Sequence, residues 1–129
     1  MKKIFFAVFC IILFGCKKSE TSSNPNFWHV KYEVTSTTSP CEAVIVYKDK
    51  NGGAIQVGEI VPTHNYQSLP WSYEADFSKD PGMLNRGLAL ALDDVEPRTS
   101  IVNFKIYVDG KLVVESTDRT SMLFYILNP

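Results

Sequence analysis

From residue 28 onward, apolar and polar side chains alternate along short runs that are separated by turn-forming residues. The first run covers residues 28–35 and places Trp28, Val30, Tyr32 and Val34 on one face. Successive side chains of a strand point to opposite faces of a sheet, so a period of two residues is typical of a half-buried strand. We therefore predict a β-strand here, with its four apolar side chains turned toward a core.

The same kind of pattern predicts further strands at residues 43–47, 54–61, 69–77, 88–92, 102–108, 111–115 and 122–127. Residues 88–92, Leu-Ala-Leu-Ala-Leu, are too few for a stable helix and are assigned as a strand with the leucines inward. Asp109-Gly110 between two such runs is a strong hairpin signal, and residues 49–53 provide another turn. About seven to eight strands at a spacing of roughly 8–12 residues predict an all-β fold, an antiparallel β-sandwich.

The N-terminus has the pattern of an export signal. Two lysines precede residues 4–14, which carry no charge and are too few for a membrane span of about 20 residues. The next segment, Leu13-Phe14-Gly15-Cys16, resembles the lipobox of bacterial lipoproteins. This resemblance implies that the Cys16 thiol takes a diacylglycerol and that the chain is cut just before it. Two or three acyl chains would hold the protein firmly to a membrane.

The lipobox divides the chain into a signal peptide at residues 1–15, a lipidated tether at residues 16–26 and a β-sandwich domain at residues 27–129. Residues 17–26 have the composition of a flexible linker, with a root-mean-square reach of roughly 16–19 Å. Lys17 stands where the inner-membrane retention signal of lipoproteins has Asp, which favours delivery to the outer rather than the inner membrane. The alternative interpretation is an uncleaved membrane anchor with an incidental cysteine.

Charge excludes two classes of partner. The whole chain has a formal net charge of −1, but residues 25–129 carry 9 basic and 13 acidic side chains, a net charge of −4. A nucleic-acid binder would show a clustered basic excess, so no nucleic acid is expected as a partner. Direct adhesion to anionic lipid headgroups is also disfavoured. The acylated Cys16 is therefore expected to make the contact with the membrane.

The cysteines and histidines suggest no chemistry. Cys10 is expected to leave with the signal and Cys16 to be acylated, so Cys41 has no intramolecular partner and is either a free thiol or an intermolecular link. A catalytic thiol needs a nearby base, and nothing in the sequence places His29 or His64 beside Cys41. Two histidines 35 positions apart with one cysteine do not have the spacing of a zinc site. We expect Cys41 to serve packing at the start of a strand.

Other catalytic patterns are missing as well. The sequence contains no Gly-x-Ser-x-Gly elbow and no glycine-rich phosphate loop. The acidic cluster Asp93-Asp94-Val95-Glu96 offers hard oxygen atoms, but it lacks the spacing of a calcium loop and is predicted to be a solvated turn between strands. Asp76 and Asp80 are interpreted in the same way. The sequence therefore predicts a protein that is not an enzyme and binds no cofactor and no metal.

Four blocks of sequence are similar, in order, to the soluble domain of the mycobacterial membrane protein small family, MmpS. They are residues 30–35, residues 43–52, Leu69-Pro70-Trp71-Ser72 and residues 106–111. The resemblance implies an immunoglobulin-like β-sandwich. It also implies the role of those proteins, which are accessory subunits of lipid and siderophore exporters of the resistance-nodulation-division class. They have no catalysis of their own, and they carry an N-terminal membrane helix where this chain predicts a lipid.

These observations favour a lipid-anchored, non-enzymatic interaction module of the cell envelope, with a transporter as its partner. Trp71 and Tyr73 are candidate partner contacts, although a tryptophan after Pro70 is also typical of a core or edge aromatic residue. The alternative is a surface lipoprotein that binds a small ligand or glycan on Tyr66, Trp71 and Tyr73. An enzyme would require a cleft with convergent, strongly shifted titratable groups.

Overall fold

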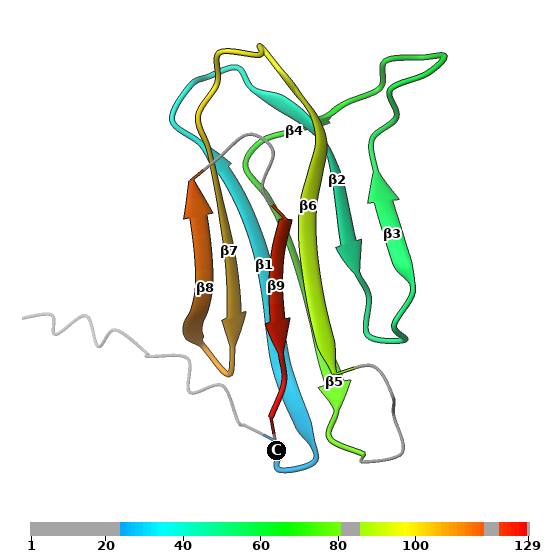
Figure 1. The fold of residues 1–129 in the computed structure, drawn as a ribbon, viewed down its shortest axis with the longest axis vertical. Helices are drawn as coiled ribbons and strands as arrows, with labels where there is room; N and C mark the ends of the chain where they lie inside the picture. The colour runs from blue at the N-terminus through cyan, green and yellow to red at the C-terminus, as the bar shows by residue number, and fades with distance from the viewer. Residues whose placement is uncertain (1–23, 81–85, 118–121, 129) are drawn as a thin grey trace, which may run out of the picture.

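The computed structural model describes residues 24–80, 86–117 and 122–128. Its strands are β1 (Phe27–Ser36), β2 (Glu42–Lys48), β3 (Ala54–Val57), β4 (Gln67–Ser68), β5 (Trp71–Ser78), β6 (Gly87–Glu96), β7 (Val102–Val108), β8 (Lys111–Thr117) and β9 (Met122–Ile126). Sheet A has the order β5-β1-β7-β8, and sheet B has the order β3-β2-β6-β9 with β4 paired to β2. The two antiparallel sheets form a sandwich (Figure 1), which confirms the predicted all-β class.

Strand β1 is central in sheet A. It pairs with β5 from Phe27↔Ser78 to Val34↔Trp71 and with β7 from Val30↔Val108 to Ser36↔Val102. Its alternate side chains are buried, as predicted, and each contributes about 1.5–3 kcal/mol of transfer free energy. The buried side chains are Trp28, Val30, Tyr32 and Val34.

Strand β6 confirms the strand assignment of the leucine-alanine run, because Leu88, Leu90 and Leu92 are buried in the core. The prediction of a turn at residues 93–96 is wrong, since β6 continues to Glu96. A β-bulge explains the difference: Ile45 lies opposite Leu92 but Val44 lies opposite Asp94, which leaves Asp93 as the extra, exposed residue.

Two tight turns follow their sequence signals. The Asp49 carboxylate accepts hydrogen bonds from the backbone N–H groups of Asn51 and Gly53, at 3.0 and 2.8 Å, and closes the β2–β3 hairpin. Asp109 and Gly110 have φ values of 50° and 76°, as a two-residue type I′ turn between β7 and β8 requires.

Strand β3 ends at Val57, four residues before the predicted end. Gly58 has a φ of 87°, and a Cβ there would lie 3.1 Å from the carbonyl oxygen of Ala43 and 3.2 Å from that of Asn65. The chain therefore leaves the sheet at Gly58 and forms a loop, residues 58–66, that projects beside the upper end of β2 (Figure 1). The Glu59 N–H donates to the Asn65 carbonyl oxygen at 2.7 Å across the base of this loop. Strand β5 begins at Trp71 rather than at Leu69.

The core lies between the two sheets. The hydroxyl of Tyr32, which is fully buried in sheet A, donates to the carbonyl oxygen of Lys48 in sheet B at 2.8 Å. Cys41 is a free thiol that is 3% exposed, so it packs in the core as expected for a small apolar residue. The other core side chains with no exposure are Val30, Val34, Ala43, Ile45, Leu88, Leu90, Val102, Phe104 and Ile106.

Candidate functional site

Trp71 and Tyr73, the predicted partner contacts, lie on the core-facing side of β5. Together with Tyr32 and Tyr47 they form a cluster that we name the aromatic seam. Tyr47 of sheet B is 5.2 Å from Trp71 and 4.5 Å from Tyr73 between ring centroids, and Tyr32 is 6.1 Å from Tyr73. Such pairs each contribute about 0.5–1.5 kcal/mol beyond the burial of their area. The aromatic seam joins the two sheets. Trp71 and Tyr73 are only half-buried, because β5 is at the edge of sheet A.

Burial raises the pKa of the Tyr32 and Tyr47 hydroxyls above the ordinary value, so both stay protonated across the physiological range. The seam therefore contributes packing and neutral hydrogen bonds rather than charge.

Tyr66 lies apart from the seam, at the end of the 58–66 loop. Its hydroxyl donates to the Asp94 carboxylate at 2.9 Å, and this hydrogen bond raises the pKa of Tyr66. Its ring stacks on His64 with the centroids 6.3 Å apart. Within the described ranges, the ring contacts of Tyr66 do not include Trp71 or Tyr73, so the three residues considered for a glycan platform do not form one stack.

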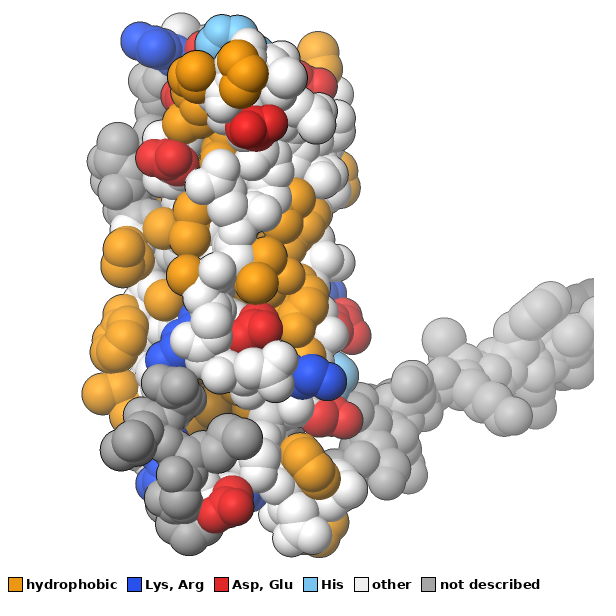
Figure 2. Space-filling model, turned by 90° about the vertical axis from the view of Figure 1, so that its right-hand side faces the viewer, with side chains coloured by type: hydrophobic (Ala, Val, Ile, Leu, Met, Phe, Trp, Pro, Cys, Tyr) orange, Lys and Arg blue, Asp and Glu red, His pale blue; other side chains and the backbone are white. Residues whose placement is uncertain are grey.

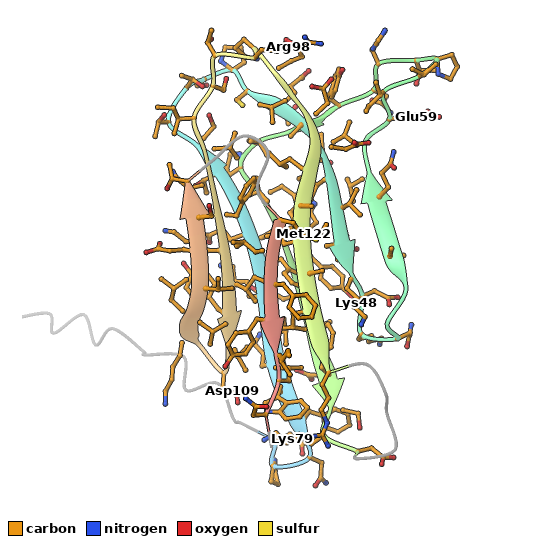
Figure 3. The ribbon with its side chains drawn as sticks, viewed as in Figure 1. Lys48, Glu59, Lys79, Arg98, Asp109 and Met122 are labelled. Atoms are coloured by element: carbon orange, nitrogen blue, oxygen red, sulfur yellow. The ribbon has the colours of Figure 1, made fainter. Side chains whose placement is uncertain are left out.

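Three of the exposed large apolar side chains lie together on β9. We name the outward side chains of Met122, Phe124 and Ile126 the β9 face; they are 68, 60 and 53% exposed. Figure 3 labels Met122 at the start of the strand. The residues of β6 directly opposite them are small: Ala91, Ala89 and Gly87. The β9 face is therefore a ridge of large side chains beside a shallow strip of small ones.

Gly87 contributes directly to this shape. A Cβ on Gly87 would lie 3.0 Å from Cζ of Phe124 and 3.1 Å from its Cε2. The Phe124 ring therefore covers the bare backbone of β6 at this point, with one side of the ring against the sheet and the other in solvent.

The sequence contained a signal for the β9 face that the strand prediction did not use. Residues 122–127 are apolar or aromatic at every position, which is typical of a strand buried on both faces. In the structure only Leu123 and Leu127 are buried, because β9 is at the edge of sheet B and its outer face has no covering layer among the described residues. Apolar side chains are also exposed among acidic ones on the side of the sandwich seen in Figure 2.

The outer face of sheet A is charged instead. His29 Nδ1 lies 2.9 Å from Asp76 Oδ1, and His29 Nε2 lies 3.5 Å from Glu74 Oε2. Lys31 Nζ is 3.2 Å from Glu33 and 3.8 Å from Glu74. A shallow depression of about 350 Å³ is lined by His29, Lys31, Glu74, Tyr107 and Gly110. In the part of the chain that the structure describes, no group of three acidic, histidine or cysteine side chains could hold a metal ion.

His29 is tied to its surroundings through its backbone as well. Its N–H donates to the Asp109 carboxylate at 2.9 Å, and its carbonyl oxygen accepts from the Asp109 N–H at 2.8 Å. The β7–β8 turn is thereby fixed beside β1, at the end of the sandwich where Figure 3 labels Asp109.

The pH dependence of the His29–Asp76 pair gives a first prediction. The hydrogen bond that His29 donates to Asp76 raises the pKa of His29 above its usual 6.5, with smaller contributions from the charges of Asp76 and Glu74. A raised folded-state pKa means that the pair stabilises the fold fully below the unfolded-state pKa, and that this contribution is lost as pH rises through the folded-state pKa. Asp76→Asn should lower the His29 pKa in an NMR titration. Asp93→Asn, in the other sheet, is the control; equal His29 pKa values in both variants would contradict the assignment.

Cys16, residues 1–15 and residues 16–23 of the tether lie outside the described residues, so lipid attachment stays a prediction. The described ranges contain no helix that is long and apolar enough to cross a membrane.

No protein-family model matches this chain, and no curated protein matches it in sequence. The resemblance to the MmpS family accordingly stays a prediction that rests on its four sequence blocks. Three features of the sandwich bear on its function: the aromatic seam between the sheets, the β9 face and the charged face of sheet A.

Proposed function

We propose that this protein is a lipid-anchored, non-enzymatic interaction module of the cell envelope. The main observation that supports this proposal is the exposed β9 face. Soluble proteins that act alone rarely expose contiguous apolar patches larger than a few hundred Å², and larger ones mark interaction sites. Met122, Phe124 and Ile126 are adjacent outward positions of one strand, and each exposes more than half of its surface.

The shape of the β9 face suits a protein partner. The Phe124 ring covers Gly87, so a partner can place its own side chains over Ala89 and Ala91 and against the ridge. Aromatic residues and methionine are enriched at the centres of protein interfaces. Phe124, with its ring seated on Gly87, is the expected energetic centre of the contact.

The N-terminal sequence supports a location at a membrane. A lipid on Cys16 and a tether with a root-mean-square reach of roughly 16–19 Å would keep the sandwich close to the bilayer. Partners would then be proteins embedded in that membrane or close to it. The resemblance to MmpS supports a transporter as the partner, with this protein as an accessory subunit.

Glycan binding is supported less well. An aromatic platform needs free ring faces, and the rings of Trp71 and Tyr73 pack against Tyr47 while Tyr66 stacks on His64. The half-exposed Trp71 and Tyr73 therefore favour a role in packing and at the strand edge over a role as a sugar platform.

Crosslinking in intact host cells tests the interaction module. A photoreactive amino acid at position 124 should yield an adduct with an envelope membrane protein that mass spectrometry identifies. The matched control is position 111, which is also exposed but lies on sheet A. The same adduct should be lost when the neighbouring side chains are made polar by Met122→Ser and Ile126→Ser. Equal adducts from both positions, or none with a membrane protein, would refute the proposed use of the β9 face.

Lipid attachment has its own test. Cys16→Ser should abolish incorporation of a labelled fatty acid and move the protein from the membrane fraction to the soluble fraction, because the acyl chains supply the membrane affinity. Cys41→Ser is the matched control and should keep the label, since the Cys41 thiol is buried in the core. A fatty-acid label that persists in Cys16→Ser would show that the lipid is elsewhere.

A further inference from the structure

Strand β5 is an edge strand with a long and regular unpaired side. It is eight residues long and pairs with β1 at every position from Trp71 to Ser78, without a bulge. In residues 24–80, 86–117 and 122–128, β1 is the only strand that pairs with β5. Its second edge therefore presents backbone N–H and C=O groups in the spacing that another strand requires.

The two faces of β5 differ in chemistry. On the side toward the core, Trp71, Tyr73 and Ala75 are half-buried, so they retain apolar surface that a neighbouring strand would cover. On the outer side, Glu74 and Asp76 expose 51 and 63% of their side chains. An added strand would therefore meet apolar side chains on one face and carboxylates on the other.

The positive charges that contact Glu74 and Asp76 come from the paired side of β5. His29 contacts Asp76 and Glu74, and Lys31 contacts Glu74, and both cations belong to β1 on the inner side of β5. These contacts therefore reach Glu74 and Asp76 from the paired side of the strand, not from its free side. The free edge thus keeps a negative character.

This charge selects among partners. A second copy of the chain, pairing antiparallel through its own β5, would bring acidic side chains next to acidic side chains, and like charges on neighbouring strands repel. A strand with Lys or Arg on one face would instead place opposite charges across the pair. Apolar side chains on its other face would pack on the exposed parts of Trp71, Tyr73 and Ala75.

We infer that the free edge of β5 is a strand-addition site for an extended segment of a partner protein in which basic and apolar residues alternate. The basic side chains face Glu74 and Asp76, and the apolar side chains extend the aromatic seam. This contact is separate from the β9 face, and it is tested with the purified protein, so the two can fail independently.

The test uses full-length protein in detergent and a fluorescent, end-capped peptide of four Lys-Val repeats. The block peptide of four lysines followed by four valines has the same composition and charge but cannot place all its lysines on one face. Fluorescence anisotropy should show at least tenfold tighter binding of the alternating peptide. A Glu-Val repeat should not bind. Methylation of alternate peptide nitrogens on the pairing edge should abolish binding, because it removes the donors to β5.

Two variants of the protein locate the site. Glu74→Lys should weaken the Lys-Val peptide at least tenfold and admit the Glu-Val peptide. Asp93→Lys makes the same change of charge on sheet B and should leave binding within twofold of the parent. Glu74→Gln, which adds no charge, should give an intermediate loss. Circular dichroism of each variant reports whether the sheets are intact.

Three results would overturn the inference. The first is equal affinity for the alternating and block peptides, which indicates attraction by net charge. The second is an equal effect of Glu74→Lys and Asp93→Lys. The third is a dimer in sedimentation experiments whose affinity changes in Glu74→Lys and not in Ile126→Ser, since this would show that the edge takes a second copy of the chain.

Discussion

Tyr32→Ala is expected to lower the free energy of unfolding by about 3–5 kcal/mol, as truncation of a buried aromatic side chain usually does. Tyr32 has no exposed surface, and its ring contacts those of Tyr47 and Tyr73 at centroid distances of 5.7 and 6.1 Å. The loss is a large part of the roughly 5–15 kcal/mol that stabilises a typical domain. Urea unfolding followed by fluorescence measures it.

The hydroxyl of Tyr32 can be tested separately with Tyr32→Phe. This change removes the hydrogen bond that the hydroxyl donates to the Lys48 carbonyl oxygen at 2.8 Å and should cost about 0.5–1.5 kcal/mol, the net contribution of a typical hydrogen bond. Tyr107→Phe removes a longer contact of 3.5 Å to Glu33 on the outer face of sheet A and should change stability by about 0.5 kcal/mol or less. Equal losses in the two phenylalanine variants would contradict a structural role of the hydroxyl between the sheets.

Gly58→Ala is expected to destabilise the protein by more than about 1–3 kcal/mol, the usual cost of an unfavourable backbone conformation. Gly58 has a φ of 87°, and a Cβ there would also lie 3.1–3.3 Å from three backbone atoms, of Ala43, Asn65 and Gln67. Backbone atoms in paired segments move less readily than flexible side chains, so the contact adds to the strain. The base of the 58–66 loop should loosen as a result.

Gly110→Ala is the matched control, because Gly110 also has a positive φ, 76°, but a Cβ there would have nothing within 4 Å. The difference between the two variants isolates the effect of crowding at Gly58. Urea unfolding should therefore show a larger loss for Gly58→Ala than for Gly110→Ala. An equal loss would mean that the loop adjusts without cost to the sheet.

The local pattern of apolar and polar residues was sufficient to predict a strand where one face of the strand is buried and the other is in solvent. In β1 the contrast between Tyr32 and its neighbours Lys31 and Glu33 identifies the strand and its inner face at once. In β9 the same rule fails, because residues 122–127 are apolar on both faces and only pairing decides which face is covered. The position of β9 at the edge of sheet B depends on contacts with residues about 35 positions earlier in the chain.

The acidic segment at residues 93–96 shows a second limit. Consecutive acidic residues favour a turn by local preference, yet the structure continues β6 through them. Two distant features make this acceptable: the bulge opposite Val44, which turns Asp93 to solvent, and the hydroxyl of Tyr66, which donates to Asp94. Neither is visible in the segment itself.

The aromatic seam could be predicted from the sequence only in part. The sequence identified Trp71 and Tyr73 as notable but left two interpretations open, a partner contact and a packing residue. Their contacts with Tyr47, which lies 24 and 26 positions away in the other sheet, establish the packing role. Their half-exposed surfaces next to the free edge of β5 keep the partner contact in the proposal.

The direction of β1 determines which end of the sandwich lies closer, along the chain, to the N-terminal segment. The strand begins at Phe27, at the end of the sandwich where the proposed tether enters, and runs to the end that carries the 58–66 loop (Figure 1). Ten residues at about 3.3 Å each separate the two ends by roughly 30 Å. Figure 3 places Lys79 and Asp109 at the end of the sandwich where β1 begins, and Arg98 at the opposite end. For a chain held by the proposed lipid on Cys16, the end that carries Asp109 is joined to the anchor by the shorter stretch of chain, so a partner in the same membrane would reach Asp109 more readily than Arg98.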